Sequence, residues 1–267
     1  MPQTKQVAAP VTSAKTSHRK ADQYNDPKHN YLHYWQGRDY EDAAEKIAIS
    51  RLLKDKHFRH AVDIGGGYGR LCIFLENYAD KVTLTDPSRQ QLDIGKEFLI
   101  DHPEIDRKLM QAANLDFADG SVDLITIVRI LHHIPDPNAE FQEIARVLAP
   151  DGYFLMEFAN YAHARNRLKH ILRAKKMPTK PVDIRSKAHQ TKEEIPFVNH
   201  NPKTVIRQLQ HAGLEVERVL SVSNLRSTTL KKNLPQGVML AVEKAMQRPF
   251  AGMYFGPSIF FLVKKSK

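Results

Sequence analysis

Cysteine is almost absent from this sequence of 267 residues, and Cys72 is its only example. A single cysteine excludes an intramolecular disulfide and any zinc site built from cysteine ligands. The lack of disulfide chemistry is typical of proteins kept in a reducing compartment, so we expect a cytoplasmic protein. We expect no metal ion in its site.

Long hydrophobic runs are also missing. No apolar stretch approaches the ~20 residues needed to cross a bilayer, so we expect no membrane span. The first 20 residues contain lysine and arginine but no apolar core, which argues against a secretory signal. Their proline, serine, threonine, alanine and lysine content instead predicts a disordered leader over residues 1–22. Residues 23–267 are predicted to form a single domain.

One segment has almost no acidic residues. The net charge of the chain is +10, and residues 161–192 hold ten lysines and arginines against one acid, Asp183, a local charge of +9. The basic character therefore belongs to one surface rather than to the whole molecule. We interpret residues 161–200 as a basic insertion, in which Pro178 and Pro181 bend the chain away from a single helix.

Segments with the patterns of strands and helices alternate from about residue 41 onward. Strands are expected over residues 61–64, 81–85, 108–112, 122–128, 153–158, 214–222 and 258–263. Helices are expected over residues 41–54, 71–78, 88–100, 138–148, 201–213 and 234–247, the last within a helical insertion at about 226–256. The helix over 138–148 is predicted to stop at the turn Pro150-Asp151-Gly152. Asn201, Pro202 and Gly213 are predicted as N-cap, first residue and C-cap of their helix. The alternation predicts an α/β fold, a doubly wound parallel sheet with helices on both faces.

A glycine-rich turn follows the first predicted strand, over residues 63–69 (DIGGGYG). A turn between a strand and a helix lets backbone amides approach a polar ligand, provided that no Cβ blocks the approach. The dinucleotide pattern G-x-G-x-x-G fails in both registers, because its third glycine position holds Arg70 or Cys72. A phosphate-binding P-loop is excluded as well, since no Gly-Lys-Ser/Thr follows.

The turn does match an acidic-x-Gly-x-Gly-x-Gly pattern, and three further segments stand in order behind it. The next strand ends in Asp86, 23 residues after Asp63; residues 115–123 read LDFADGSVD, and residues 131–136 read LHHIPD. Together with residues 34–41 and 256–260, these segments resemble class I S-adenosylmethionine-dependent methyltransferases over residues 31–160, and more loosely over 201–265. The resemblance implies a Rossmann-like doubly wound sheet of seven strands, mostly parallel, with the last strand antiparallel.

The same resemblance implies the residues that bind S-adenosylmethionine. Gly65, Gly66 and Gly67 would leave room for the methionyl part, and Asp63 would approach its ammonium group directly or through water. Asp86 would accept hydrogen bonds from both ribose hydroxyls. The remaining implied contacts come from Val128 after the fourth strand, from Arg38 toward the methionyl carboxylate, and from Gln111-Ala112 at the adenine, where the family usually has Asp-Ala.

His132 and His133 follow the central strand, at the edge where open α/β sheets bind their ligands. One of them is a candidate general base, although a base is needed only if the methyl acceptor must lose a proton. The alternative is that both histidines pack or hydrogen-bond within their loop. The aromatic residues Tyr24, Tyr31, Tyr34, Trp35 and Tyr40 either form a lid over the cofactor or belong to a helix packed on the sheet.

Three functions remain open. The first is a methyltransferase acting on a small molecule, with an acidic acceptor suited to the basic insertion. The second is an RNA methyltransferase that uses this insertion, but no RNA-binding module and no Asn/Asp-Pro-Pro-aromatic loop accompany it. The third is a non-catalytic protein that binds the cofactor. We favour the first.

Overall fold

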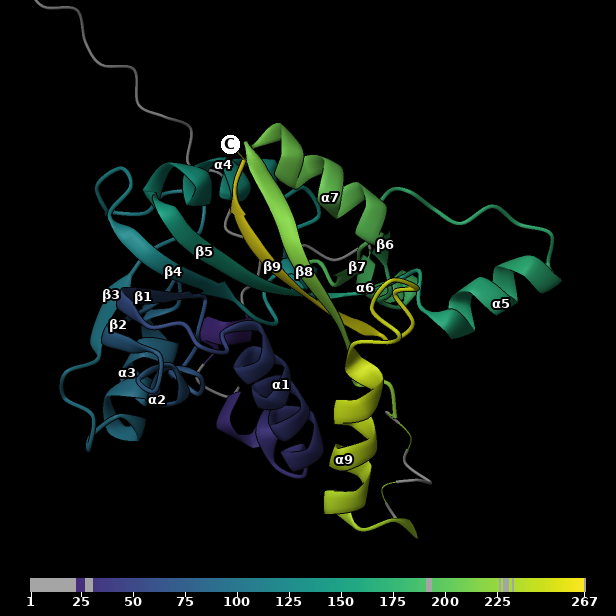
Figure 1. Ribbon diagram of the computed structural model, residues 1–267, viewed down its shortest axis with the longest axis horizontal. Helices are drawn as coiled ribbons and strands as arrows, with labels where there is room; N and C mark the ends of the chain where they lie inside the picture. The colour runs from purple at the N-terminus through teal and green to yellow at the C-terminus, as the bar shows by residue number, and fades with distance from the viewer. Residues whose placement is uncertain are drawn as a thin grey trace, which may run out of the picture.

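The computed structural model describes residues 23–26, 31–190, 194–225, 227, 231 and 233–266. The disordered leader predicted for residues 1–22 lies outside the described residues. Within them, strands form one large sheet that is covered by helices on both faces (Figure 1).

The sheet has seven strands in the order β3-β2-β1-β4-β5-β9-β8. Neighbouring strands pair in parallel except at β9, which runs antiparallel to both β5 and β8. The predicted Rossmann-like sheet, mostly parallel with the last strand antiparallel, is therefore confirmed. The strands are β1 (Phe58–Ile64), β2 (Ala79–Asp86), β3 (Asp106–Leu109), β4 (Val122–Ile127), β5 (Leu148–Ala159), β8 (Leu214–Val222) and β9 (Ser258–Lys265).

The central strands are apolar on both faces because each face packs against its own helices. Ala61 and Val62 are neighbours in β1 and are both buried, yet they belong to different hydrophobic clusters. One cluster lies under α1 (Asp39–Leu52), α2 (Cys72–Leu75) and α3 (Arg89–Phe98). The other lies under α4 (Asn138–Val147) and α7 (Pro202–His211). Figure 1 shows these two groups of helices on opposite faces of the sheet.

Asn201 and Pro202 begin α7 as predicted, whereas the C-cap of this helix is Ala212, one residue before the predicted Gly213. Ser88 caps α3 by accepting a hydrogen bond from Gln91 N, and Asn201 caps α7 in the same way from Lys203 N. Pro202 is the first residue of α7, and Gly213 follows its C-cap with φ of +73°.

Three predicted elements differ clearly from the structure. The strand expected over 108–112 is β3, which begins at Asp106 and ends at Leu109. The helix expected over 71–78 is only the four-residue α2. The turn expected at residues 150–152 is instead part of β5, which begins at Leu148 directly after α4 and contains a register shift opposite Val122 and Leu124. The irregular register accommodates Pro150 and Gly152 inside a strand, which the turn signal alone did not predict.

The segment predicted as a basic insertion leaves the sheet after β5. It contains α5 (Ala164–Leu172), the two-stranded sheet of β6 (Val182–Asp183) and β7 (Val198–Asn199), and α6 (Lys187–Gln190). A second excursion between β8 and β9 contains α9 (Gln236–Gln247), whose Gln247 donates to the Ala44 carbonyl of α1. No helix among the described residues has the length and apolar character that a bilayer crossing requires.

Candidate functional site

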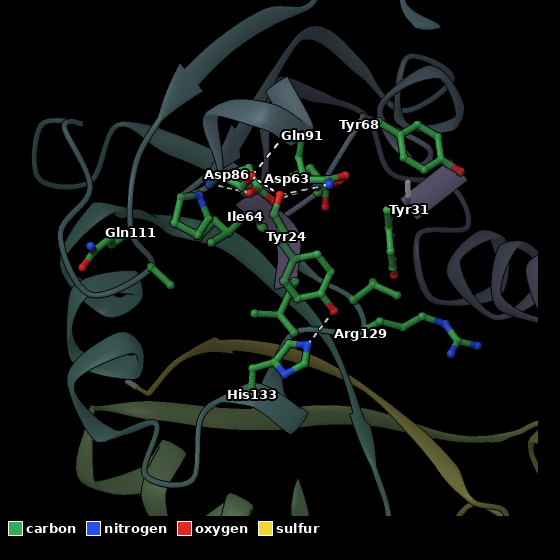
Figure 2. Close-up of a pocket in the computed structure, with 18 of the residues that line it drawn as sticks. Tyr24, Tyr31, Asp63, Ile64, Tyr68, Asp86, Gln91, Gln111, Arg129 and His133 are labelled. Carbon is green, nitrogen blue, oxygen red and sulfur yellow. Dashed lines mark hydrogen bonds between the residues drawn. The ribbon is translucent and has the colours of Figure 1, made fainter. Parts of the chain in front are cut away.

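A cavity of about 280 Å³ opens where β1, β2 and β4 end. Its wall is formed by the glycine turn, the residues after β2 and the loop after β4, and it is closed from the side by the short 3-10 helices η1 (Gln23–Asn25) and η2 (Tyr31–Trp35). Parallel strands place their carboxyl ends at one edge, and this edge is the usual ligand site of open α/β sheets. The sequence therefore places Asp63, Asp86 and His133 around one space (Figure 2).

The glycine turn needs glycine for two separate reasons. Gly65 and Gly67 have φ of +65° and +62°, where L side chains are strained. A Cβ on Gly65 would also lie 2.6 Å from Ile130 Cδ1. The backbone of the turn thus stays bare on the cavity side, and all three glycines of the prediction line the cavity.

Asp63 is the last but one residue of β1, and 2% of its surface is exposed. Thr126 of β4 donates a hydrogen bond of 2.5 Å to its Oδ1. Burial raises the pKa of Asp63 to about 6, although the Thr126 hydroxyl and the Arg70 charge act in the opposite direction. A cationic group in the cavity would favour the ionised carboxylate here.

Asp86 ends β2 and is held by the backbone on either side of the cavity. Its Oδ2 accepts from Gly67 N at 2.9 Å, and its Oδ1 accepts from Ser88 N at 2.8 Å. These bonds fix the carboxylate at the cavity wall, where its remaining acceptor capacity suits a pair of hydroxyl donors.

Gln111, Ala112 and Val128 also line the cavity. Gln111 is exposed, and Figure 2 shows its amide at the outer rim of the site. Glu140 in the first turn of α4 lines the cavity as well, and its Oε2 is buried without a hydrogen-bond partner among the described residues. Burial raises the pKa of Glu140. The sequence prediction did not include Glu140, because nothing local distinguishes it from an ordinary first-turn acid.

His133 faces the cavity, and its hydrogen bonds define its tautomer. The carbonyl of Pro196 only accepts, so in the neutral ring Nδ1 of His133 donates to it, at 3.0 Å. Nε2 then carries no hydrogen and accepts from the Tyr24 hydroxyl at 2.8 Å. Figure 2 shows the Tyr24 ring extending from η1 across the cavity to His133.

His132 has a different environment. It does not line the cavity, and its ring packs against Phe197 with a centroid separation of 4.3 Å. Burial, and then the neighbouring His133, hold the pKa of His132 well below its usual value. The two candidate histidines are thus distinguished by the structure: one faces the ligand space and the other packs beside it.

Arg38, predicted to reach a cofactor carboxylate, lies outside the cavity wall, and its guanidinium is 4.0 Å from the Tyr34 ring centroid. The cations that do line the cavity are Arg70 and Arg129, which lie over the Trp35 ring at 3.6 and 4.9 Å. Both bind the buried Glu45 of α1. Arg129 has a positive φ of +62° that a local pattern does not reveal.

The aromatic residues of the predicted lid divide between two roles. Tyr24, Tyr31 and Trp35 line the cavity, and the Tyr31 ring stacks on Tyr34 at 5.2 Å. Tyr40 is buried in α1 and donates to Glu243 of α9 at 3.0 Å. The first group covers the ligand space, whereas Tyr40 belongs to the packed helix.

Comparison with known proteins agrees with this geometry. The sequence pattern of the methyltransferase domain family matches residues 62–156, which run from β1 through most of β5 and contain the glycine turn, Asp86 and both histidines. Residues 62–156 are thus similar to a methyltransferase domain.

Curated relatives match somewhat less than half of the chain. A ubiquinone/menaquinone biosynthesis C-methyltransferase of Rubrivivax gelatinosus is 33% identical over 118 residues, 44% of this chain and 46% of the relative. An uncharacterized methyltransferase of Bacillus subtilis is 28% identical over 124 residues, 45% of this chain and 49% of the relative. The matches thus span about half the length of each relative.

The methyltransferase fold extends over nearly the whole chain. A SAM-dependent methyltransferase from Thermotoga maritima superposes with a TM-score of 0.60 over 89% of this chain and 94% of its own, at 17% identity. S-adenosylmethionine is the cofactor that the family and this neighbour imply.

The residues of the cavity fit this cofactor. A buried carboxylate at Asp63 suits an ammonium group, and the anchored Asp86 suits the two ribose hydroxyls. The bare backbone at Gly65 and Gly67 allows close approach. The unpartnered Oε2 of Glu140 provides the acceptor that an adenine amino group requires.

Proposed function

We propose that the protein is an S-adenosylmethionine-dependent methyltransferase whose acceptor is a small molecule that loses a proton to His133. The observation that carries the proposal is the position of His133, which lines the same cavity as Asp63, Asp86 and the glycine turn and whose Nε2 lies 2.8 Å from the Tyr24 hydroxyl. When bound, the cofactor supplies a methyl group on a positively charged sulfur, which is already activated for transfer.

The protein's own contribution is alignment and proton removal. Asp63, Asp86 and Glu140 would hold the cofactor at three points along the cavity. His133 would take the proton of the acceptor on Nε2, while the Pro196 carbonyl keeps the ring in the required orientation. Tyr24 occupies the hydrogen-bonding position on Nε2, and the acceptor's O–H or N–H group would replace it there. The aromatic residues of η1 and η2 exclude water from this space.

A small acceptor is favoured over RNA because the insertion closes the site. Its Ile195 lines the cavity, and the next two residues contact the histidines, Pro196 through its carbonyl and Phe197 by ring packing. The R. gelatinosus relative, named for ubiquinone/menaquinone biosynthesis, makes phenol-like ring compounds a reasonable first acceptor class. An acidic acceptor would in addition suit the basic insertion.

The test is turnover of S-adenosylmethionine with a panel of phenols, quinols, amines and carboxylates, measured as S-adenosylhomocysteine formed. With an accepted substrate, His133→Gln should lower kcat about a hundredfold or more and remove the fall in kcat at acidic pH that protonation of this base causes. His132→Gln is the matched control, since its ring lies beside the cavity, and should retain most of kcat. Equal rates for both variants would remove His133 as the base. Cofactor binding without turnover on any acceptor class would instead support the non-catalytic alternative.

A further inference from the structure

Helix α5 projects from the body of the molecule with none of its residues buried. It follows β5 and extends beyond the small sheet of β6 and β7, away from the layers of the fold (Figure 1). Packing against the core therefore does not account for the side chains of α5. These side chains are open to contact with another molecule.

One face of α5 carries exposed apolar side chains. Leu168, Ile171 and Leu172 are 57%, 73% and 77% exposed. Their spacing of three and four residues places them on the same side of the helix. Single exposed apolar residues are common, but three adjacent ones on an otherwise polar helix mark an interaction face.

The rest of the helix and its C-terminal extension are strongly basic. Residues 164–176 contain six lysines and arginines and no acid: Arg165, Arg167, Lys169, Arg173, Lys175 and Lys176. Among the described residues none of these six forms an ion pair within the chain, whereas Arg185, farther along the insertion, is paired with Asp183. The charge around the apolar stripe is thus available to a partner.

An apolar stripe flanked by unpaired cations is the chemistry that recognises an anionic membrane surface. The leucine and isoleucine side chains enter the boundary between headgroups and acyl chains, while lysine and arginine bind lipid phosphates and carboxylates. RNA would satisfy the charges but leave the apolar stripe in water, and the one aromatic ring of α5, that of His170, is already hydrogen-bonded to the Tyr161 hydroxyl and the Lys176 carbonyl. We propose that α5 docks the protein on anionic phospholipid membranes.

The placement of α5 would bring the methyltransferase cavity close to that surface. The helix follows the carboxyl end of β5, the same edge at which the cavity opens. The far end of the insertion returns to the cavity through Ile195 and to His133 through Pro196. Docking itself depends only on the surface of α5 and does not rest on the proposed function.

The test is flotation of the full chain with vesicles of phosphatidylcholine alone and with about one third phosphatidylserine added. We expect the protein to float with the anionic vesicles and to stay behind with the neutral ones. Leu168→Ser/Ile171→Ser/Leu172→Ser, which keeps every charge, should lower the bound fraction about tenfold, and so should Arg173→Gln/Lys175→Gln/Lys176→Gln.

The matched control is Val238→Ser/Val242→Ser on α9, where the two valines are 50% and 43% exposed but lie on a helix without a basic cluster. This variant should float like the unchanged protein. Thermal unfolding of each variant checks that it is folded. Failure of the unchanged protein to float, or equal flotation of the serine variant of α5, would overturn the proposal. Binding of a single-stranded RNA oligonucleotide in place of vesicles would assign the basic insertion to RNA instead.

Discussion

Asp63 is an almost fully buried carboxyl group, and burial disfavours its charged form. Burial raises its pKa to about 6. In the folded protein without a bound cationic ligand, the carboxyl group therefore stays protonated at a higher pH than it does in the unfolded chain. Stability contributed by this group is therefore fully present below the unfolded pKa of about 4 and is lost as the pH rises through about 6. An ammonium group placed beside Asp63 reverses the preference and stabilises the ionised form.

This reversal predicts that binding of S-adenosylhomocysteine strengthens with pH. Because protons compete with the ammonium group for Asp63, affinity should increase about tenfold between pH 5 and pH 7, as measured by calorimetry. Asp63→Asn should bind more weakly and lose most of this dependence. Asp151→Asn, an exposed acid far along the chain, is the control and should keep it. If Asp63→Asn kept the pH dependence of the unchanged protein, the ammonium group would not bind beside Asp63.

The place of a single residue in the site could be predicted from sequence where a motif ties that residue to a turn or to the end of a strand. The three glycines, Asp63 and Asp86 line the cavity as expected, because strand and turn geometry place them there. Arg38 lies over Tyr34 instead, and Glu140 had no local signal. The bond between Tyr24 and His133 joins residues 109 positions apart, a relation that depends on the whole fold.

Among the elements, α1 is tied to the cavity by one buried carboxylate. Glu45 is 1% exposed and accepts from Arg70 at 2.8 Å and from Arg129 Nε at 2.6 Å. Arg70 follows the glycine turn, and Arg129 follows β4 and donates its backbone N–H to Glu157 of β5. The helix, the turn and two strands thus share one ionic network.

We predict that Glu45→Gln destabilises the protein by about 3 kcal/mol, because it leaves two largely buried guanidinium groups without their common anion. Urea unfolding monitored by circular dichroism measures the change. Lys81→Gln, which breaks the exposed Lys81–Asp106 pair of 2.8 Å, should cost less than about 1 kcal/mol. Similar losses of unfolding free energy in the two variants would show that the buried network stabilises the fold no more than an exposed ion pair does.

Element type was predicted better than element length. The bounds of β8 match the sequence pattern, because Gly213 ends α7 and a run of apolar residues follows at once. Helix α2 is much shorter than expected, since the periodic pattern continues into residues 76–78 although the backbone turns toward β2. The spacing of Tyr78 from the apolar residues of α2 is the same in a turn as in a further helical turn, so the pattern does not distinguish the two.

At the scale of the whole molecule, the sheet and its two cores form a unit from which α5 is separable. No residue of α5 is buried, and both hydrophobic clusters are composed of residues outside residues 164–176. The number of strands and their mostly parallel direction followed from the alternation of segments and from the resemblance to the family. The direction in which the insertion projects followed from neither, because composition indicates charge but not placement.

We predict that replacing residues 165–176 with a glycine-serine linker of equal length changes the free energy of unfolding by less than about 1 kcal/mol, since no buried side chain is lost. Binding of S-adenosylhomocysteine should be retained, because no residue of this stretch lines the cavity. Chemical denaturation and calorimetry provide the two measurements. A loss of several kcal/mol would place α5 within the cooperative unit.

The contact of the Trp35 ring with the guanidinium groups of Arg70 and Arg129 has a practical consequence. Trp35 is the single tryptophan of the chain, so all indole emission originates at the cavity wall. Two flanking guanidinium groups make that emission sensitive to any shift of the surrounding charges. The protein thus carries a built-in optical reporter, and ligand titrations followed by intrinsic fluorescence need no label, no coupling enzyme and no knowledge of the acceptor.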